Sequence, residues 1–294
     1  MGDTHVDGSS QTETRTLEKD AIPFRTGPVG QANLGHQSSQ QISITPKLYN
    51  NAPIRRGRCV IFSNKVFQAH TNIPEREGAD EDERSLAGCF TALGFDVSIY
   101  NDLLGKEITN ELKKLGKDDY TEHDSFVCCL STYDMEGHLY GSDGRRISID
   151  EVMKPFLGDE CQSLLGKPKL FFIQACRGRN YQKGVPLDKA DSSGEGLRIP
   201  THADFLFAYS TVPGFISFRY KKEGSIFVQT LCTVLQQYAH TADLLHMLTL
   251  VCQKVALELD GVFRTTPDGE KIAVKQMPSF MSTLRHLVYF SRRS

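Results

Sequence analysis

The chain has 294 residues, of which 39% are hydrophobic and 24% are charged, and its formal net charge is -2 at pH 7. This length and hydrophobic content allow one large domain, or two closely packed halves, around a full core. The nearly balanced charge, with no dense basic stripe, argues against nucleic acid as a partner.

Membrane and metal functions are also not expected. No apolar run approaches the roughly 20 residues that cross a bilayer, and the start of the chain lacks the charged-then-apolar pattern of a signal peptide. We therefore expect a cytoplasmic protein without membrane contact. The eight cysteines include no C-x-x-C pair and no cysteine and histidine cluster at zinc spacing, so we expect reduced thiols, no metal and no cofactor.

The first 46 residues are predicted to form a short flexible tail. They are rich in Ser, Thr, Gln and Gly and contain too few apolar residues to offset the entropy cost of ordering the chain.

Strands and helices alternate in the next part of the chain. Apolar runs or apolar and polar alternation predict strands at residues 59–62, 95–100, 125–130 and 169–174. Apolar residues at helical spacing predict helices at residues 80–93 and 106–115. This alternation predicts a parallel sheet, and the two continuous apolar runs are typical of strands buried on both faces.

Residues 188–196 have the polar composition of an exposed loop, where proteases commonly cut. Beyond the loop we expect a strand at residues 204–209, helices at 225–238 and 242–259, and a final apolar strand at 280–290. That last strand would be an exposed sheet edge in a monomer, so pairing with a like chain is expected.

The sharpest local motif is Gln174-Ala175-Cys176-Arg177-Gly178, which follows the buried strand at residues 169–174. Functional loops gather at the carboxyl ends of parallel strands, which is where Cys176 falls. A buried core thiol is the alternative interpretation. The pentapeptide is nevertheless typical of one group of cysteine peptidases, the caspases.

The resemblance to the caspase family covers residues 58–290 and includes the segments 166–178, 203–206 and 208–211. It implies an α/β fold with a mainly parallel six-stranded sheet between helices, in an endopeptidase that cuts after aspartate. It also implies a prodomain at residues 1–46, a large-subunit-like region at 47–187, a linker at 188–197 and a small-subunit-like region at 198–294.

The resemblance further implies a pocket for an aspartate side chain, with Arg76, Gln174 and Arg219 at the matching positions. Guanidinium groups suit a carboxylate because they donate paired hydrogen bonds. Ser217 to Arg219 should pair with an extended peptide by strand addition. Ile216 departs from the aromatic residue that the family often has there, which leaves the neighbouring subsite open. Solvated surface arginines are the alternative interpretation of Arg76 and Arg219.

The family's catalytic histidine and glycine are missing where the resemblance places them. Leu130-Ser131-Thr132 is followed by Tyr133 in place of the general-base His and by Asp134 in place of the oxyanion-hole Gly. A phenol with a reference pKa of about 10 cannot replace an imidazole near ~6.5. The negative charge of Asp134 disfavours a thiolate at Cys176.

Three other histidines are candidate substitutes for the base. His123 precedes its predicted strand and would lie roughly 20 Å from the catalytic end, and His202 also precedes its strand. His138 is nearer in sequence, but residues 137–141 should lead away as a small hairpin, which favours a solvated side chain.

Three aspartates are candidate cleavage sites: Asp20, Asp188 and Asp191, the last favoured in the linker because serine follows it. An active caspase would make the linker cut. A cut after Asp20 would expose Ala21-Ile22-Pro23-Phe24, which resembles the tetrapeptide that the BIR domains of inhibitor-of-apoptosis proteins bind. An ordinary apolar stretch in a flexible tail is the alternative.

The predicted function is that of a non-catalytic or severely impaired caspase homologue. It would regulate apoptosis by pairing with an active caspase or by occupying an inhibitor-of-apoptosis protein. The alternative is an active Asp-specific cysteine endopeptidase with an atypical general base.

Overall fold

The computed structural model describes residues 17–19, 47–49, 55–135, 138–177, 182–183, 203–259, 263–265, 269 and 271–290. The rest of the predicted tail and the whole predicted linker at 188–197 lie outside the described residues. The same holds for three predicted cleavage sites, for one histidine and for the BIR-type tetrapeptide, namely Asp20, Asp188, Asp191, His202 and residues 21–24.

A six-stranded sheet forms the centre of the molecule, in the order β15-β10-β8-β4-β2-β3. Its first five strands along the chain pair in parallel, and only β15 is antiparallel to its neighbour. The strands span β2 Arg55–Ser63, β3 Asp96–Asn101, β4 His123–Ser131, β8 Lys169–Gln174, β10 Phe205–Tyr209 and β15 Ser279–Ser282. The predicted mainly parallel six-stranded sheet is confirmed.

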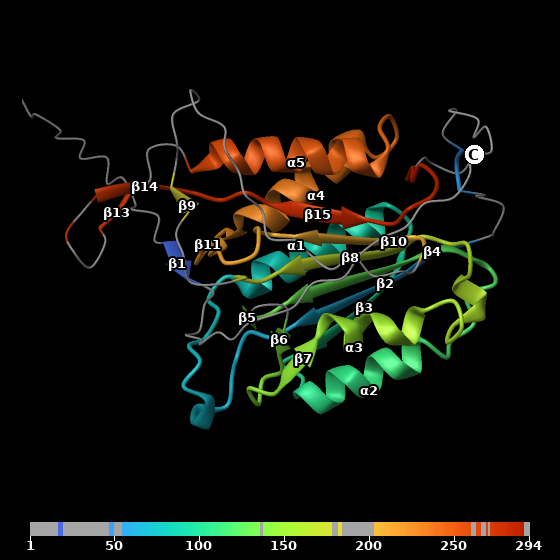
Figure 1. Cartoon of the computed structure of the whole chain (residues 1–294), viewed down its shortest axis with the longest axis horizontal. Coiled ribbons are helices and arrows are strands. Elements are labelled where there is room, and N and C mark those ends of the chain that lie inside the picture. Colours follow the sequence, from blue (N-terminus) through green and yellow to red (C-terminus); the bar gives the residue numbers. More distant parts are fainter. Residues whose placement is uncertain are drawn as a thin grey trace, which may run out of the picture.

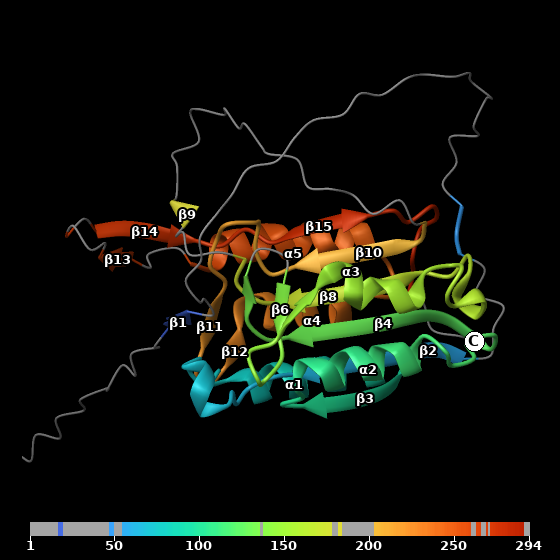
Figure 2. The same cartoon turned by 60° about the horizontal axis from the view of Figure 1, so that its bottom comes forward.

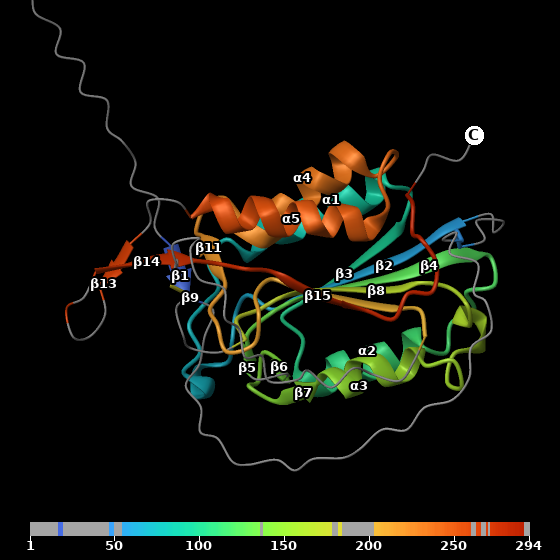
Figure 3. The ribbon, with the colours of Figure 1, turned by 45° about the horizontal axis from the view of Figure 1, so that its top comes forward.

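Helices cover both faces of this sheet (Figure 3). On one face lie α1 (Ala79–Ala92), α4 (Ile226–Tyr238) and α5 (Leu244–Glu258), and on the other lie α2 (Gly105–Leu115) and α3 (Ile149–Met153). Every residue of β4 and β8 is buried, because these central strands have helices on both sides. Their continuous apolar sequence is therefore explained by the layers around them.

Three small sheets flank the central sheet. The first is the hairpin region predicted at residues 137–141, and it contains β5 Asp134–Met135, β6 His138–Tyr140 and β7 Arg146–Ser148. The second contains β1 Leu17–Lys19, β11 Phe218–Tyr220 and β12 Gly224–Ser225. The third contains β9 Gln182–Lys183, β13 Phe263–Thr265 and β14 Lys271–Lys275. The first two lie at the end of the molecule where the parallel strands finish (Figures 1 and 2).

Three short 3-10 helices complete the described elements: η1 Ala69–Thr71, η2 Lys154–Phe156 and η3 Gln162–Leu164. Within the described ranges, no helix is both long and apolar enough to cross a membrane.

The predicted final strand at residues 280–290 is wrong in its length, because β15 ends at Ser282. The residues that follow pack against helices instead. The backbone amide of Leu244, the first residue of α5, donates to the carbonyl of Val288 at 2.8 Å, and Phe290 is buried in the same core. The backbone amides in the first turn of a helix have no acceptor within that helix, and Val288 supplies one for α5.

The predicted flexible tail is wrong at residues 17–19, which form β1. The partner strand β11 supplies the backbone hydrogen-bonding groups that the segment cannot find locally.

Candidate active site

The candidate site lies at the carboxyl ends of β4 and β8. Ser131, the last residue of β4, pairs with Gln174, the last residue of β8, and the Thr132 amide donates to the Gln174 carbonyl at 3.2 Å. Tyr133 and Cys176 each come two residues after this pair. Tyr133 and Cys176 therefore follow two paired strands at the same edge of the sheet.

Cys176 is fully buried and lies against Ser217. The Ser217 backbone amide donates to Cys176 Sγ at 3.2 Å, and Sγ is also 3.4 Å from the Ser217 carbonyl oxygen. One residue before the cysteine, the Ala175 amide donates to Ser210 Oγ at 3.2 Å, and that hydroxyl donates to the Ala175 carbonyl at 2.8 Å. These bonds connect the end of β8 to Ser210 and Ser217.

Gln174 connects the strand end to the predicted peptide-binding segment. Its Nε2 donates to Ser217 Oγ at 2.9 Å, and both side chains are buried. Residues 217 and 218 lead directly into β11, so the predicted nucleophile, Gln174 and Ser217 are brought together as the sequence implied.

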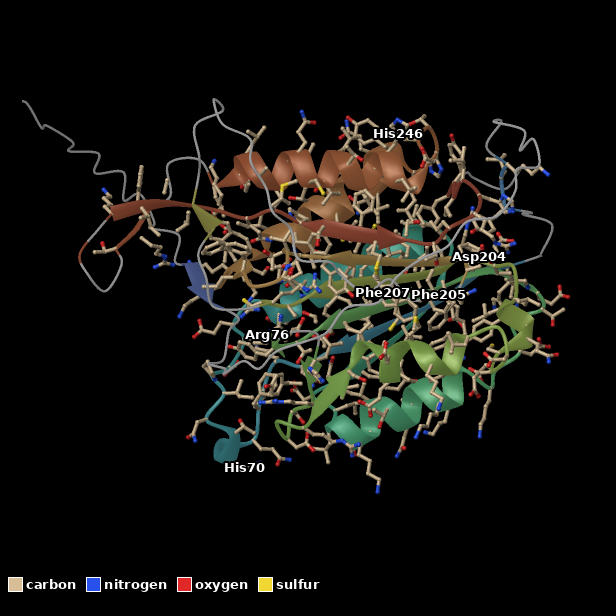
Figure 4. All side chains as sticks on the ribbon, in the orientation of Figure 1. His70, Arg76, Asp204, Phe205, Phe207 and His246 are labelled. Atoms are coloured by element: carbon tan, nitrogen blue, oxygen red, sulfur yellow. The ribbon has the colours of Figure 1, made fainter. Side chains whose placement is uncertain are left out.

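Arg76 lies in the segment before α1 and reaches the end of β4. Its Nη1 donates to the Asn64 carbonyl at 2.9 Å, and its Nη2 donates to Ser131 Oγ at 3.1 Å. Figure 4 places Arg76 at the end of the sheet opposite to Asp204, which lies at the start of β10. With 0% of its surface exposed, Arg76 is not the solvated surface arginine of the alternative interpretation.

Arg219 in β11 reaches the same loop from the other side. Its Nε donates to the Glu77 carbonyl at 2.6 Å, and the residue is 1% exposed. Since Glu77 follows Arg76 directly, the two predicted pocket arginines converge on one loop although they lie far apart in the sequence.

Asp82 is a member of this region that the sequence analysis missed. Its Oδ1 accepts hydrogen bonds from the Ser225 amide at 2.6 Å and from Gln229 Nε2 at 3.2 Å. Burial raises its pKa to about 6, and the positive charges of Arg219 and Arg76 act in the opposite direction. Helical spacing with Leu86 and Phe90 was the available signal, because it places Asp82 on the buried face of α1.

Tyr133 is buried in a small aromatic cluster. Its ring centroid lies 5.3 Å from that of Phe67, and its hydroxyl donates to the Pro74 carbonyl at 3.3 Å. The Arg76 Cζ atom lies 5.9 Å from the centre of the same ring. Tyr133 therefore packs against the pocket arginine.

Asp134 is also buried, and it organises the start of the β5–β6 hairpin. Its Oδ1 accepts a hydrogen bond from the His138 amide at 3.0 Å. Arg177, the residue after Cys176, lies with Cζ 4.0 Å above the Tyr209 ring. Burial lowers the pKa of Arg177, while the charges of Tyr209 and Asp134 favour its protonated form. The carboxylate of Asp134 thus acts electrostatically on the neighbour of Cys176.

Neither described histidine candidate stands at the site. His123 is the first residue of β4 rather than a residue before the strand, and the eight residue steps to Ser131 correspond to about 26 Å. Burial lowers its pKa, which weakens it further as a proton acceptor. His138 is exposed on β6. The predicted hairpin is observed, because β6 pairs antiparallel with both β5 and β7.

Within the described part of the chain, no group of three or more His, Cys, Asp or Glu residues is arranged to hold a metal ion.

Comparisons with known proteins agree with this geometry. The family model described as the caspase domain matches residues 56–289. The chain is 41% identical over 235 residues to caspase-3 of Bos taurus, covering 80% of this chain and 84% of that protein. It is 34% identical over 311 residues to caspase-7 of Gallus gallus, covering 98% of this chain and 99% of that protein.

A solved structure is similar as well. The crystal structure of caspase-1 from Spodoptera frugiperda matches with a TM-score of 0.74 and 34% identity, covering 87% of this chain and 99% of that chain.

Proposed function

The chain belongs to the caspase family, and from this premise we propose that it is a non-catalytic or severely impaired caspase homologue. It regulates apoptosis by binding an active caspase or an inhibitor-of-apoptosis protein. The observation that carries the proposal is the position of Tyr133. It comes two residues after Ser131 of β4, and Cys176 comes two residues after Gln174, the partner of Ser131 in β8.

A tyrosine at this position does not supply general-base catalysis. A phenol is protonated and neutral at pH 7, whereas a general base must be unprotonated to accept a proton. The hydroxyl of Tyr133 already donates to the Pro74 carbonyl. An unassisted thiol with a pKa of about 8.5 is only slightly ionised, and loss of acid and base help typically costs ~10²–10⁴-fold in rate.

Asp134 adds a second obstacle to turnover. Its buried carboxylate favours the positive charge on Arg177, and the same negative charge opposes a thiolate and an oxyanion forming one residue away at Cys176. A glycine at this position would add no charge.

Peptide binding is proposed to survive the loss of turnover. Arg219 donates to the carbonyl of Glu77, the residue after Arg76, and Gln174 donates to Ser217, which precedes the strand that would pair with a peptide. Two guanidinium groups provide paired donors for a carboxylate, so an Asp-terminated peptide is the expected ligand.

Pairing with an active caspase is proposed to use the β15 edge of the sheet. β15 pairs with β10 on one side and ends the sheet order on the other. Phe280 within β15 and Met277 just before it are each 37% exposed. An apolar strand edge of this kind favours pairing with another strand, and a second copy of this chain would fit the same edge.

The second regulatory route begins with a cut after Asp20 by an active caspase. The new amino terminus, Ala21-Ile22-Pro23-Phe24, would carry a free amine for acidic groups while the next residues extend along a sheet edge. Binding of the peptide AIPF-amide to a BIR domain tests this route. An affinity no better than high micromolar would reject it.

The test of the main proposal is turnover. The chain, cut at Asp191 beforehand, is incubated with an Asp-terminated fluorogenic peptide beside its Cys176→Ala variant. We expect both to release fluorophore at the same background rate. Cys176-dependent turnover close to that of an active caspase would instead support the alternative, an active Asp-specific endopeptidase with an atypical base.

Regulation is tested by adding either the natural chain or its Cys176→Ala variant to an active caspase. The Cys176→Ala variant should change the rate of that caspase as much as the natural chain does, because the effect depends on binding. A change that requires Cys176 would contradict a non-catalytic role.

A further inference from the structure

The strand β1 occupies the free edge of β11. The two strands pair antiparallel, with Leu17 opposite Tyr220, Glu18 opposite Arg219 and Lys19 opposite Phe218. The other edge of β11 pairs with β12. Figure 2 shows β1 beside β11 at the end where the parallel strands of the central sheet finish. A segment near the start of the chain is therefore the added strand of a sheet at the candidate site.

The direction of β1 is set by this register. Along β1 from Leu17 to Lys19, the partner residues run from Tyr220 back to Phe218. The next partner position is Ser217, which contacts Cys176 Sγ through its backbone and Gln174 through its hydroxyl. The carboxyl end of β1 thus points toward the candidate nucleophile.

The residue that follows β1 in the sequence is Asp20. Asp20 lies outside the described residues. In sequence, Leu17-Glu18-Lys19-Asp20 is an Asp-terminated peptide, which is the class of ligand proposed for this site.

We propose that β1, residues 17–19, is the chain's own ligand for its peptide-binding site. The inference rests on the peptide-binding part of the proposed function and names the occupant. Backbone hydrogen bonds along β11 supply the affinity, and the covalent tether gives the segment an effective concentration that free peptides rarely reach. An external peptide must displace β1 before it can pair with β11.

The inference also links the two regulatory routes. An active caspase that hydrolyses the Asp20–Ala21 bond adds water across it, with the hydroxyl going to the Asp20 carbonyl carbon and the proton to the Ala21 nitrogen. The released segment loses its tether and its effective concentration. One cut therefore opens the peptide-binding site and exposes the Ala21 amine.

The first test is hydrogen exchange of the whole natural chain, followed by mass spectrometry. Backbone amides of residues 17–19 should exchange at least about tenfold more slowly than in an unstructured peptide, because pairing protects them. The protection should not change on dilution, since the contact is within one chain. Exchange at the unstructured rate would overturn the proposal.

The matched variant carries Glu18→Pro and Lys19→Pro. In an antiparallel pair consecutive amides point to opposite sides, so one of these two faces β11, and proline removes both donors. Ser9→Pro with Ser10→Pro is the control in the same part of the chain. Protection at residues 17–19 should disappear in the first variant and persist in the second.

The second test measures binding of a fluorescent Leu-Glu-Lys-Asp peptide. The proline variant and the full chain cut at Asp20, after removal of the tagged caspase, should each bind about tenfold more tightly than the uncut chain. Equal affinity in all three would overturn the proposal while peptide binding stands. If none of them binds, the peptide-binding part of the proposed function fails, and hydrogen exchange alone decides whether β1 pairs with β11.

Discussion

The Arg76 Cζ atom lies 5.9 Å from the centre of the Tyr133 ring, so a residue of the predicted aspartate pocket packs on a ring two residues beyond the end of β4. Cation and ring contacts of this kind contribute roughly 0.5–2 kcal/mol. Tyr133 is therefore expected to be a structural support of the pocket as well as an ineffective base.

This contact predicts how two substitutions of Tyr133 differ. Tyr133→Phe keeps the ring against Phe67 and Arg76 and loses the hydroxyl that bonds the Pro74 carbonyl, so the free energy of unfolding should fall by about 1 kcal/mol. Tyr133→Ala removes a fully buried ring and should cost about 3–5 kcal/mol. Urea unfolding measures both values, and equal losses would contradict a packing role for the ring.

Restoring the family residues should restore turnover. Tyr133→His together with Asp134→Gly supplies an imidazole two residues after the end of β4 and removes a buried negative charge that acts on Arg177. We expect the rate on an Asp-terminated fluorogenic peptide to rise at least about 100-fold. The same pair of changes with Cys176→Ala is the control and should stay inactive. No gain in the double variant would mean that further parts of the machinery are lost.

Peptide affinity should depend on the shape of Arg219 and not only on its charge. Arg219→Lys keeps a cation but loses the Nε donor to the Glu77 carbonyl and the planar fork. The affinity for a labelled Asp-terminated peptide, measured after the cut at Asp20, should fall about tenfold or more. Arg84→Lys, at an exposed position on α1, is the matched control and should not change it. Equal affinities in the two variants would argue that the carboxylate is held elsewhere.

Stability should depend on pH through Asp82. Burial raises the pKa of Asp82 to about 6 from a reference of 3.8, so between these values the folded state binds a proton that the unfolded state releases. The contribution of Asp82 to the free energy of unfolding is thus greatest below pH ~4 and decreases by about 3 kcal/mol as the pH rises past ~6.

The variant that tests this is Asp82→Asn, which cannot titrate. Urea unfolding between pH 4 and pH 7 should give a flatter pH dependence than that of the natural chain. Asp159→Asn removes an exposed carboxylate instead and is the control. Parallel curves for Asp82→Asn and the natural chain would show that Asp82 has no raised pKa.

Pairing should be sensitive to charge on the β15 edge. Phe280→Asp places a carboxylate at a 37% exposed position of this edge strand, where a partner strand would have to desolvate it. Capture of a tagged active caspase, and self-association in sedimentation, should both be strongly reduced. Phe263→Asp, at a 49% exposed phenylalanine on β13, is the control. Unchanged capture by Phe280→Asp would place the interface elsewhere.

Much of the fold can be predicted from local sequence patterns. The apolar run at residues 169–174 is observed as β8 with the same bounds, and residues 80–93 correspond to α1 within one residue at each end. Such elements are predictable because side-chain periodicity along a few residues reflects which faces are buried. The predicted strand at residues 280–290 failed because apolar residues after Ser282 are buried against helices, and short apolar runs look alike in both settings.

By itself, the sequence determined the alternation of strands and helices, the placement of Cys176 at a strand end, and Tyr133 two residues after Ser131. It did so because each of these features is a pattern among residues that lie close together in the chain. Only the tertiary structure decided that Arg219 donates to the loop that holds Arg76, that Asp82 accepts hydrogen bonds from Ser225 and Gln229, and that β1 pairs with β11. Each of these depends on contacts between segments separated by more than a hundred residues. Periodicity can show that a residue is buried, but it does not show which distant residue is its hydrogen-bond partner.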